Sequence, residues 1–354
     1  MISRDQINEL SKRLAIDEFT VIREYLQIVF LSILYSTNES QKIYFKGGTA
    51  IRLLMKSSRF SEDLDFTAEL TTKQLDSITA ETVKKMSLVV PGISIKRTRE
   101  TNLSYTAILS YLQEGSKYPL TIHLDFSLRE KPETSKENIL ETDFPVAPQP
   151  IIRHMDWVEV LSEKIRAFLY RQKGRDIYDL WFMLSKGVEL NWDMINRKTK
   201  FYDMKTSFDD VLKRVNAFED EKIKTDLGKF LPAHERGLAV QLKNMTIKQL
   251  MSRQSFIIAT SENVDYSKVP EHSFSGTDKF LKPEDIKTAK ITEIKRQDEN
   301  NIEIKMIAIS GKEATAYIRA RSRNGVRELN VIADKADTFK GLSYEEFINQ
   351  KINT

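Results

Sequence analysis

Apolar residues in the first 36 positions recur at the three- and four-residue spacing that is typical of helices. Ile7, Leu10 and Leu14 mark the face of one helix, and Asp17 is a typical N-cap residue ahead of a second one. Shorter patterns then alternate between strands and helices as far as residue 127. The predicted strands cover residues 42–46, 63–67, 92–99, 103–112 and 119–127, and the predicted helices cover residues 50–55 and 75–86.

The pattern changes after a stretch that is rich in proline. Residues 130–150 contain four prolines among many polar residues, so we predict a loop or linker there. Helical periodicity dominates afterwards, up to about residue 262. The predicted helices of this part cover residues 158–172, 177–184, 205–220 and 234–253.

A third region begins at residue 263. Residues 263–287 are polar and hold two prolines, as a linker does, and a final helix is predicted from Ser343 to residue 352. Between them, Asn324-Gly325 is a strong hairpin signal. The predicted strands are 289–296, 301–309, 313–321 and 326–333. We therefore predict an α/β core with N-terminal helices at 1–150, a helical domain at 151–262, and a linker with a β-rich region at 263–354.

Composition limits the class of protein. The chain has 354 residues, of which 40% are hydrophobic and 30% charged, as in soluble globular proteins. It has no cysteine, which excludes disulfides and thiolate metal sites. We see neither a secretory signal nor an apolar run that could cross a bilayer, and we expect a cytoplasmic protein without membrane contact. The net charge of +4 does not by itself indicate nucleic-acid binding.

A glycine turn followed by paired aspartates is the strongest chemical signal. Gly47-Gly48-Thr49 opens a short predicted helix, where glycines let backbone N–H groups approach a phosphate. Asp63 and Asp65 follow, and in a strand they would project from the same face. Adjacent carboxylates repel each other unless a cation lies between them, and their oxygens suit magnesium. The pattern indicates a site for a nucleoside triphosphate and magnesium ions.

Asp125 is the candidate third carboxylate. It shares the polar face of its predicted strand with His123, while Leu124 and Phe126 point into the core. If that strand neighbours the one with the aspartate pair, three carboxylates can bracket two magnesium ions and activate an attacking hydroxyl. Taken alone, Asp63 or Asp65 is better explained as an ordinary residue at a strand end, and it is the pair after Gly-Gly-Thr that favours a functional site.

Several charged residues of the second half are candidates for the same site. Lys164 lies beside the apolar stripe of its helix, where a lysine often extends toward water, but its ammonium could instead face a triphosphate. Arg175, Asp176 and Asp179 follow closely. Asp176 could simply cap the next helix, and Asp179 lies one turn further along. The residues alone favour neither interpretation.

Arginines alternate along the predicted ribbon near the C-terminus. Arg319, Arg321 and Arg323 would share one face of a strand, and Arg327 lies just past the Asn-Gly turn. Such a face can contact the phosphates of RNA. A charged edge that discourages aggregation explains the same pattern equally well.

Two pairs of segments carry a resemblance to a known family. The first joins Gly-Gly-Thr-Ala at 47–50 to Arg-Phe-Ser-Glu-Asp-Leu-Asp-Phe at 59–66, and the second joins Glu-Lys-Ile-Arg-Ala at 163–167 to Arg-Asp-Ile-Tyr-Asp-Leu at 175–180. They resemble the signature blocks of the AbiEii/AbiGii family of nucleotidyltransferase-like toxins. The resemblance implies an α+β fold like that of DNA polymerase β-type nucleotidyltransferases, followed by a helical domain. It also implies a bacterial toxin–antitoxin pair linked to abortive phage infection.

The resemblance further implies roles for individual residues. Asp63, Asp65 and Asp125 would bind two magnesium ions, with Asp125 also activating the acceptor hydroxyl and Lys164 contacting phosphate. Thr49 stands where such enzymes often carry serine, and the β-rich region after residue 263 lies outside the family pattern. The implied nucleotide-binding residues are Gly47, Gly48, Thr49, Ser61, Lys164, Arg175, Asp176 and Asp179.

We therefore expect a magnesium-dependent nucleotidyltransferase toxin that moves a nucleoside monophosphate from a nucleoside triphosphate to RNA. The tRNA 3′ end is the acceptor, and a cognate antitoxin protein the partner, that the resemblance implies. Two alternatives stay open from the residues. One is transfer to a small molecule or a protein, and the other is a nucleotide-binding module without turnover.

Overall fold

In a computed structural model, the residues described are 1–113, 115–171, 173–200 and 206–254, together with the backbone of four strands between residues 290 and 332. The chain folds into two compact units, Met1–Gln249 and Leu250–Thr354. The predicted division at residue 150 lies inside the first unit, and it stays a prediction.

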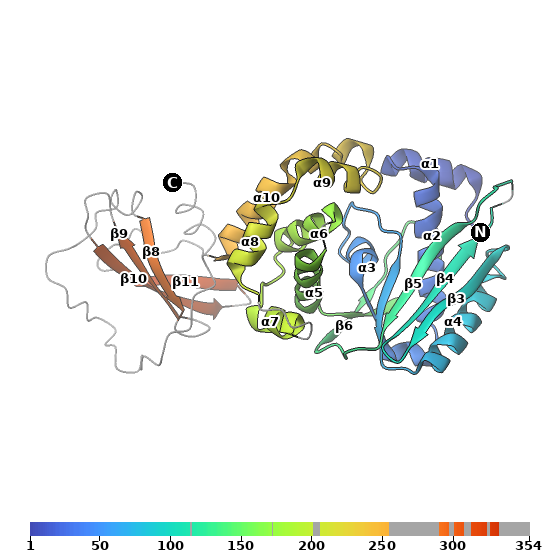
Figure 1. The fold of residues 1–354 in the computed structure, drawn as a ribbon, viewed down its shortest axis with the longest axis horizontal. Helices are drawn as coiled ribbons and strands as arrows, with labels where there is room; N and C mark the ends of the chain where they lie inside the picture. The colour runs from blue at the N-terminus through green and yellow to red at the C-terminus, as the bar shows by residue number, and fades with distance from the viewer. Residues whose placement is uncertain are drawn as a thin grey trace. The chain divides into compact units, whose positions relative to one another are not determined.

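A seven-stranded mixed sheet forms the centre of the first unit (Figure 1). The strands are β1 (Ile43–Lys46), β2 (Leu64–Ala68), β3 (Ile93–Thr101), β4 (Ser104–Tyr111), β5 (Leu120–Ser127), β6 (Ser135–Ile139) and β7 (Ile151–Met155). Their order across the sheet is β3-β4-β5-β2-β1-β7-β6. β2 runs parallel to β5 and β1 runs parallel to β7, whereas the other neighbours are antiparallel. The first five strands confirm the predicted ones to within about two residues.

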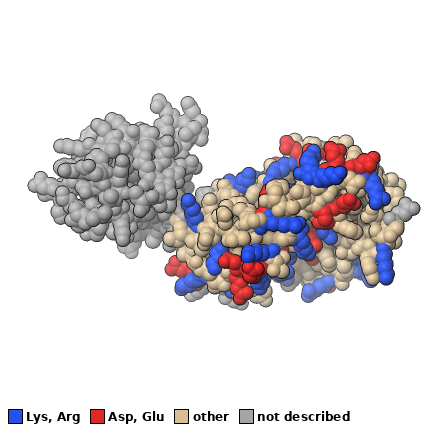
Figure 2. Space-filling model, turned by 90° about the horizontal axis from the view of Figure 1, so that it is seen from above, with Lys and Arg blue, Asp and Glu red and all other residues tan. Residues whose placement is uncertain are grey.

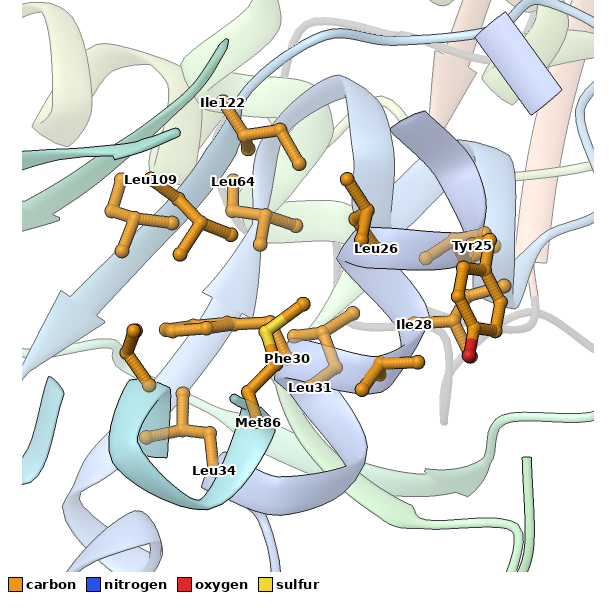
Figure 3. Packing of buried hydrophobic residues seen from close by; sticks show 14 of the residues in the cluster. Tyr25, Leu26, Ile28, Phe30, Leu31, Leu34, Leu64, Met86, Leu109 and Ile122 are labelled. Atoms are coloured by element: carbon orange, nitrogen blue, oxygen red, sulfur yellow. The ribbon is translucent and has the colours of Figure 1, made fainter. Parts of the chain in front are cut away.

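Helices α1 (Arg4–Leu14), α2 (Glu18–Leu34) and α4 (Thr72–Met86) accompany the sheet, and α3 (Gly47–Leu54) follows β1 directly. Asp17 caps α2 as predicted, because its carboxylate accepts a hydrogen bond from the backbone of Thr20. In the view of Figure 1, β3, β4 and β5 lie in front of α2 and α4. Figure 3 shows the interface, where apolar side chains of α2, α4 and the sheet point toward one another. Its labelled members include Leu26, Phe30, Leu34, Met86, Leu64, Leu109 and Ile122.

A row of aromatic rings crosses the buried face of the sheet. The ring centroids are 5.3 Å apart for Phe45 and Phe66, 4.6 Å for Phe66 and Phe126, and 5.9 Å for Phe126 and Tyr105. Successive residues of a strand point to opposite faces. The residues that adjoin these aromatics are therefore held on the other face of β1, β2, β5 and β4.

The prediction of a loop over residues 130–150 was wrong for β6. This strand pairs with β7, where Glu137 lies opposite Arg153 and accepts a hydrogen bond of 2.5 Å from its guanidinium group. Every residue of β6 is exposed. An edge strand of this kind needs no alternation of apolar and polar residues, so it carries no periodic signal.

Helices dominate the first unit after β7. The helices are α5 (Trp157–Tyr170), α6 (Gly174–Ser185), α7 (Trp192–Lys200), α8 (Phe208–Asn216), α9 (Asp220–Leu227) and α10 (Leu238–Gln254), with short 3-10 turns at η1 (Asn38–Lys42) and η2 (Ala233–Glu235). The helical character predicted for this part is confirmed, but α7 and α9 were not predicted as separate helices. No helix among the described residues is long and apolar enough to cross a membrane. Figure 2 shows basic and acidic side chains intermixed over the face in view, as the small net charge leads one to expect.

The second unit contains a four-stranded antiparallel sheet of order β11-β10-β9-β8. Its strands are β8 (Lys290–Arg296), β9 (Asn301–Ile307), β10 (Glu313–Arg323) and β11 (Val326–Ile332), close to the predicted ones. Arg323 pairs with Val326, which is the register that a two-residue hairpin requires. Asn324-Gly325, the predicted linker and the predicted C-terminal helix lie outside the described residues. The arginines proposed to contact RNA lie in β10 and β11, and that role stays a prediction.

Candidate active site

The glycine turn brings charged side chains against the backbone at the start of α3. Gly47 has φ +79°, and a Cβ atom there would lie 2.0 Å from Oδ2 of Asp65. At Gly48, a Cβ atom would lie 2.6 Å from Nη2 of Arg59 and 2.9 Å from Oγ of Ser61. Glycine is required at position 47, where φ is positive and a methyl group would collide with Asp65, whereas at Gly48 the ends of the Arg59 and Ser61 side chains would have to shift.

The Gly47→Ala protein is expected to be about 1–3 kcal/mol less stable and to lose activity, because alanine is strained at this φ and its methyl group collides with Asp65. Gly187→Ala is the matched control. Gly187 has φ +82°, and nothing lies within 4 Å of its missing Cβ. Thermal melts and a nucleotide-transfer assay compare the two proteins. Equal activity in both would contradict the importance of the contact between Gly47 and Asp65.

Three charged residues form a row across the sheet on the face opposite the aromatic rings. Lys46 of β1 pairs with Asp65 of β2, and Asp65 pairs with Asp125 of β5. The expectation that Asp65 and Asp125 lie on neighbouring strands is therefore confirmed. Asp63 was predicted as the first residue of its strand, but β2 begins at Leu64, so Asp63 lies in the segment just before it.

The three aspartates act on one another electrostatically. Burial raises the pKa of Asp65 to about 6, an effect that Lys164 and Lys46 oppose and that Asp63 and Asp125 reinforce. Burial and the neighbouring Asp63 also raise the pKa of Asp125. Among the described residues, none of the three carboxylates has a hydrogen-bond or ion-pair partner. The site thus concentrates negative charge that the surrounding side chains leave largely uncompensated.

These carboxylates fit divalent cations of the magnesium type. They are hard oxygen donors without protein partners, and their mutual repulsion would be relieved by positive charge. Within the described ranges, no three His, Asp or Glu side chains converge into a ready-made metal cage. Magnesium commonly uses one or two carboxylates together with water and substrate phosphates.

A buried ion-pair cluster supports Lys164 beside the aspartates. The Nζ atom of Lys164 lies 2.8 Å from Oδ2 of Asp179. Arg59 binds the same carboxylate through Nε at 2.8 Å and Nη2 at 3.1 Å, and both side chains are at most 2% exposed. Burial opposes ionisation of Asp179, but Arg59 and Lys164 prevail and lower its pKa. Asp179 therefore links the second predicted block to the segment that leads into β2.

The remaining residues of the second block lie at the start of α6. Asp176 is fully buried and accepts two hydrogen bonds of 2.9 Å from Arg171, so it does not cap the helix, whose N-cap is Lys173. The hydrogen bond to Asp176 raises the pKa of Arg171, and Asp65 and Asp179 add to this effect. Arg175 is half-buried, and no described residue forms a hydrogen bond or ion pair with its side chain.

Thr49 and Ser61 help to shape the loop that ends at Asp63. The buried hydroxyl of Thr49 donates a hydrogen bond to the carbonyl of Asp63, so this hydroxyl is already engaged within the protein. The carbonyls of Ser61 and Glu62 accept hydrogen bonds of 3.1 and 3.0 Å from the side chain of Gln27. Both interactions fix the backbone from which Asp63 projects.

Sequence reasoning missed Lys46 and Glu163. The Nζ atom of Lys46 lies 2.9 Å from Oε2 of Glu163, the neighbour of Lys164, and both side chains are mostly buried. Lys46 also lowers the pKa of Asp65. Lys46 directly precedes Gly47 and Glu163 directly precedes Lys164, which was a signal in the sequence. Their contact could not be predicted, because it joins segments that are more than 100 residues apart.

Comparisons with solved structures yield distant likenesses. The crystal structure of JHP933 from Helicobacter pylori is 22% identical in sequence, with 68% of this chain and 96% of that chain covered and a TM-score of 0.44. MenT4, a nucleotidyltransferase toxin from Mycobacterium tuberculosis, is 17% identical, with 70% and 90% covered and a TM-score of 0.44. No curated protein matches the chain.

A family model gives a stronger result. The model described as nucleotidyl transferase AbiEii toxin, type IV toxin–antitoxin system, matches residues 30–245. The match covers more than half of the chain and includes both blocks described above. The chain therefore belongs to the AbiEii family of nucleotidyltransferase toxins of type IV toxin–antitoxin systems.

Proposed function

We propose that this protein is a magnesium-dependent enzyme that transfers a nucleoside monophosphate from a nucleoside triphosphate to RNA, with the tRNA 3′ end as the acceptor. The observation that carries the proposal is the pairing of Asp65 with Asp125 on neighbouring parallel strands, with Asp63 just before the first of them. Such a cluster of carboxylates beside a glycine turn suits a triphosphate and its metal ions.

Asp63, Asp65 and Asp125 would hold two magnesium ions. When bound, the ions would neutralise triphosphate charge and favour ionisation of the attacking hydroxyl. Asp125 has a raised pKa, which suits a group that accepts a proton from that hydroxyl. The hydroxyl oxygen then bonds to the α-phosphorus, and pyrophosphate leaves with the electrons of the broken P–O bond.

The triphosphate would lie at the start of α3. Backbone N–H groups at Gly47, Gly48 and Thr49 are placed where a helix N-terminus favours an anion. Ser61 lies against Gly48 and could add a hydroxyl contact. Lys164 would contact phosphate while Asp179 positions its ammonium group. Arg175, at the start of α6, would complete the proposed nucleotide-binding set, whereas Asp176 is fully buried against Arg171 and would act through that side chain.

Lys164→Ala is expected to raise the KM for the nucleoside triphosphate about 10-fold or more, because it removes a charge-assisted contact worth about 1.5–3 kcal/mol. Lys164→Arg, which keeps the charge, should retain part of the affinity. Lys186→Ala, on the surface after α6, serves as the control. The KM values are measured by steady-state transfer kinetics. A KM in Lys164→Ala equal to that of the control would show that Lys164 does not contact the triphosphate.

The acceptor class is tested in a total bacterial extract. The protein is incubated with each α-labelled nucleoside triphosphate, and the label is resolved into RNA, protein and small-molecule fractions. Label in RNA of tRNA size supports the proposal. Label in the protein or small-molecule fraction would show that the acceptor is not RNA. If the protein binds the nucleotide but transfers no label, a nucleotide-binding module without turnover is favoured.

The toxin would act in the cytoplasm as part of abortive phage infection. Modification of the tRNA 3′ end would block translation and so stop growth. A cognate antitoxin protein would restrain it. The family match supports a toxin–antitoxin role. Co-expression of the cognate antitoxin should restore growth.

A further inference from the structure

We propose that the solvent-exposed face of β3, β4 and β5 is the surface that seats the acceptor RNA, with Lys96 and Arg99 binding its phosphates. The inference rests on the proposed function and names where its acceptor lies. It follows from four features of this face, which are its exposure, its charge, a β-bulge, and its continuity with Asp125.

One face of these strands is covered and the other is open. Helix α4 packs on β3 and β4, and helix α2 packs on β5. On the other face, Lys96 and Arg99 of β3 and His123 of β5 are all exposed. In Figure 1 no helix is drawn over this side of β3, β4 and β5. An exposed sheet face of this kind is a platform on which a single RNA strand can lie.

The charge of the open face suits a nucleic acid. Within β3, β4 and β5, Asp125 is the single acidic residue on this face, because Glu100 lies opposite the buried Tyr105 on the helix side. The side chains of Lys96 and Arg99 have no ion-pair or hydrogen-bond partner among the residues that the structure describes. Unpaired cations are available to bind phosphates, and the serine and threonine hydroxyl groups of these strands add further hydrogen-bond donors.

A β-bulge separates two arginines that would otherwise share a face. Arg97 lies opposite Ala107, and Arg99 lies opposite Thr106, so the register shifts by one residue between them. Residues two apart normally point the same way, and a bulge of one residue reverses this. Arg97 is thereby placed on the helix side, where it contacts Glu100 at 2.8 Å and Asp76 at 3.7 Å. Arg99 is placed on the open face.

The bulge also aligns Arg99 with the row that Lys46, Asp65 and Asp125 form across the sheet. Arg99 pairs with Thr106, Thr106 pairs with Asp125, and Asp125 pairs with Asp65. Neighbouring strands are about 4.8 Å apart, so Arg99 lies roughly 10 Å from Asp125 along this row. An RNA strand whose terminal hydroxyl reaches Asp125 would therefore pass its first phosphates over Thr106 toward Arg99.

The test compares two proteins that lose the same charge from opposite faces. Lys96→Ala/Arg99→Ala removes two cations from the open face. Arg97→Ala/Lys85→Ala removes two cations that are already paired, with Glu100 and with Glu81. Affinity for unfractionated bacterial tRNA is measured by fluorescence anisotropy over a range of salt concentrations. Transfer kinetics are measured on the same tRNA, and thermal melts confirm that both proteins are folded.

The open-face variant is expected to bind tRNA about 10-fold more weakly, with a salt dependence whose slope is shallower by about 1.4, since each single-strand phosphate contact contributes about 0.7. Its KM for tRNA should rise while the KM for the nucleoside triphosphate stays unchanged. The control should match the wild type in all four quantities.

Three outcomes overturn the inference, and they can be told apart. If wild type and both variants label and bind tRNA equally well, the acceptor lies on another surface and the proposed function stands. If the wild type transfers label to no RNA, the proposed function fails and the inference fails with it. A loss of tRNA affinity that is equal in both variants also overturns the inference, because it would reflect net charge alone.

Discussion

The Asp65→Asn protein is expected to lose nucleotide transfer by more than about 100-fold and yet to be more stable than the wild type in the absence of metal. The loss is large because even groups that merely support metal ligands contribute about 10–100-fold. Asparagine keeps the shape of aspartate, so it fits against Gly47 as aspartate does. What it removes is the negative charge between Asp63 and Asp125.

The gain in stability follows from the pKa of Asp65, which folding raises from 3.8 to about 6. A raised pKa means that the ionised carboxylate destabilises the folded state. This cost is absent below about pH 4, grows as the pH rises to 6, and is complete above that value. Because Asp65 is partly exposed, we expect Asp65→Asn to recover about 1–3 kcal/mol at pH 8 and almost nothing at pH 4.

Urea unfolding of the metal-free proteins at pH 4 and pH 8 measures this difference. Added magnesium should stabilise the wild type more than Asp65→Asn, since binding to the folded state raises stability by mass action. Asp143→Asn, at an exposed carboxylate paired with Arg13, is the control and should change neither property appreciably. If Asp65→Asn were less stable than the wild type at pH 8, the picture of uncompensated repulsion would be wrong.

The Asp179→Ala protein is expected to be about 3–5 kcal/mol less stable than the wild type. Asp179 is the carboxylate that neutralises Arg59 and Lys164, and the side chain of Arg59 is 2% exposed. Removing one partner of a buried ion pair leaves an uncompensated charge, which is far more costly than breaking a surface pair. Activity should fall as well, because Lys164 loses the group that positions it.

Thermal melts measure this loss, which should lower the Tm by about 10 °C for a unit of this size. The control is Glu137→Ala, which breaks the exposed pair with Arg153 and should cost about 1 kcal/mol or less. A melting temperature of Asp179→Ala within about 2 °C of the control would contradict the role given to the buried cluster, since that margin corresponds to about 1 kcal/mol.

Local patterns explain how much of the fold could be predicted. Alternation along residues 119–127 placed Phe126 in the core and Asp125 on the opposite face, and the structure shows both. Asp17 as a helix cap and the strand before Gly47 followed from similarly local rules. In contrast, β6 is exposed along its whole length and has no hydrophobic pattern to reveal it.

The site was predictable in its carboxylates but less so in what surrounds them. The spacing of Asp63 and Asp65 suggested a common face, although Asp63 precedes the strand. The partners of Asp179 and Glu163 could not be read from spacing, because Arg59 and Lys46 lie more than 100 residues away in the chain. The β-bulge at Arg97 and Arg99 is likewise invisible in a two-residue alternation, which predicts that both share a face.

The most direct test of the central claim is transfer by the purified protein. Wild type and Asp65→Asn are incubated with magnesium, total bacterial RNA and each α-labelled nucleoside triphosphate in turn, and the RNA is resolved on a denaturing gel. We predict a labelled band of tRNA size with wild type and none with Asp65→Asn. Equal labelling by both proteins would contradict the role of the aspartates, and no labelled RNA with wild type would contradict nucleotidyl transfer to RNA.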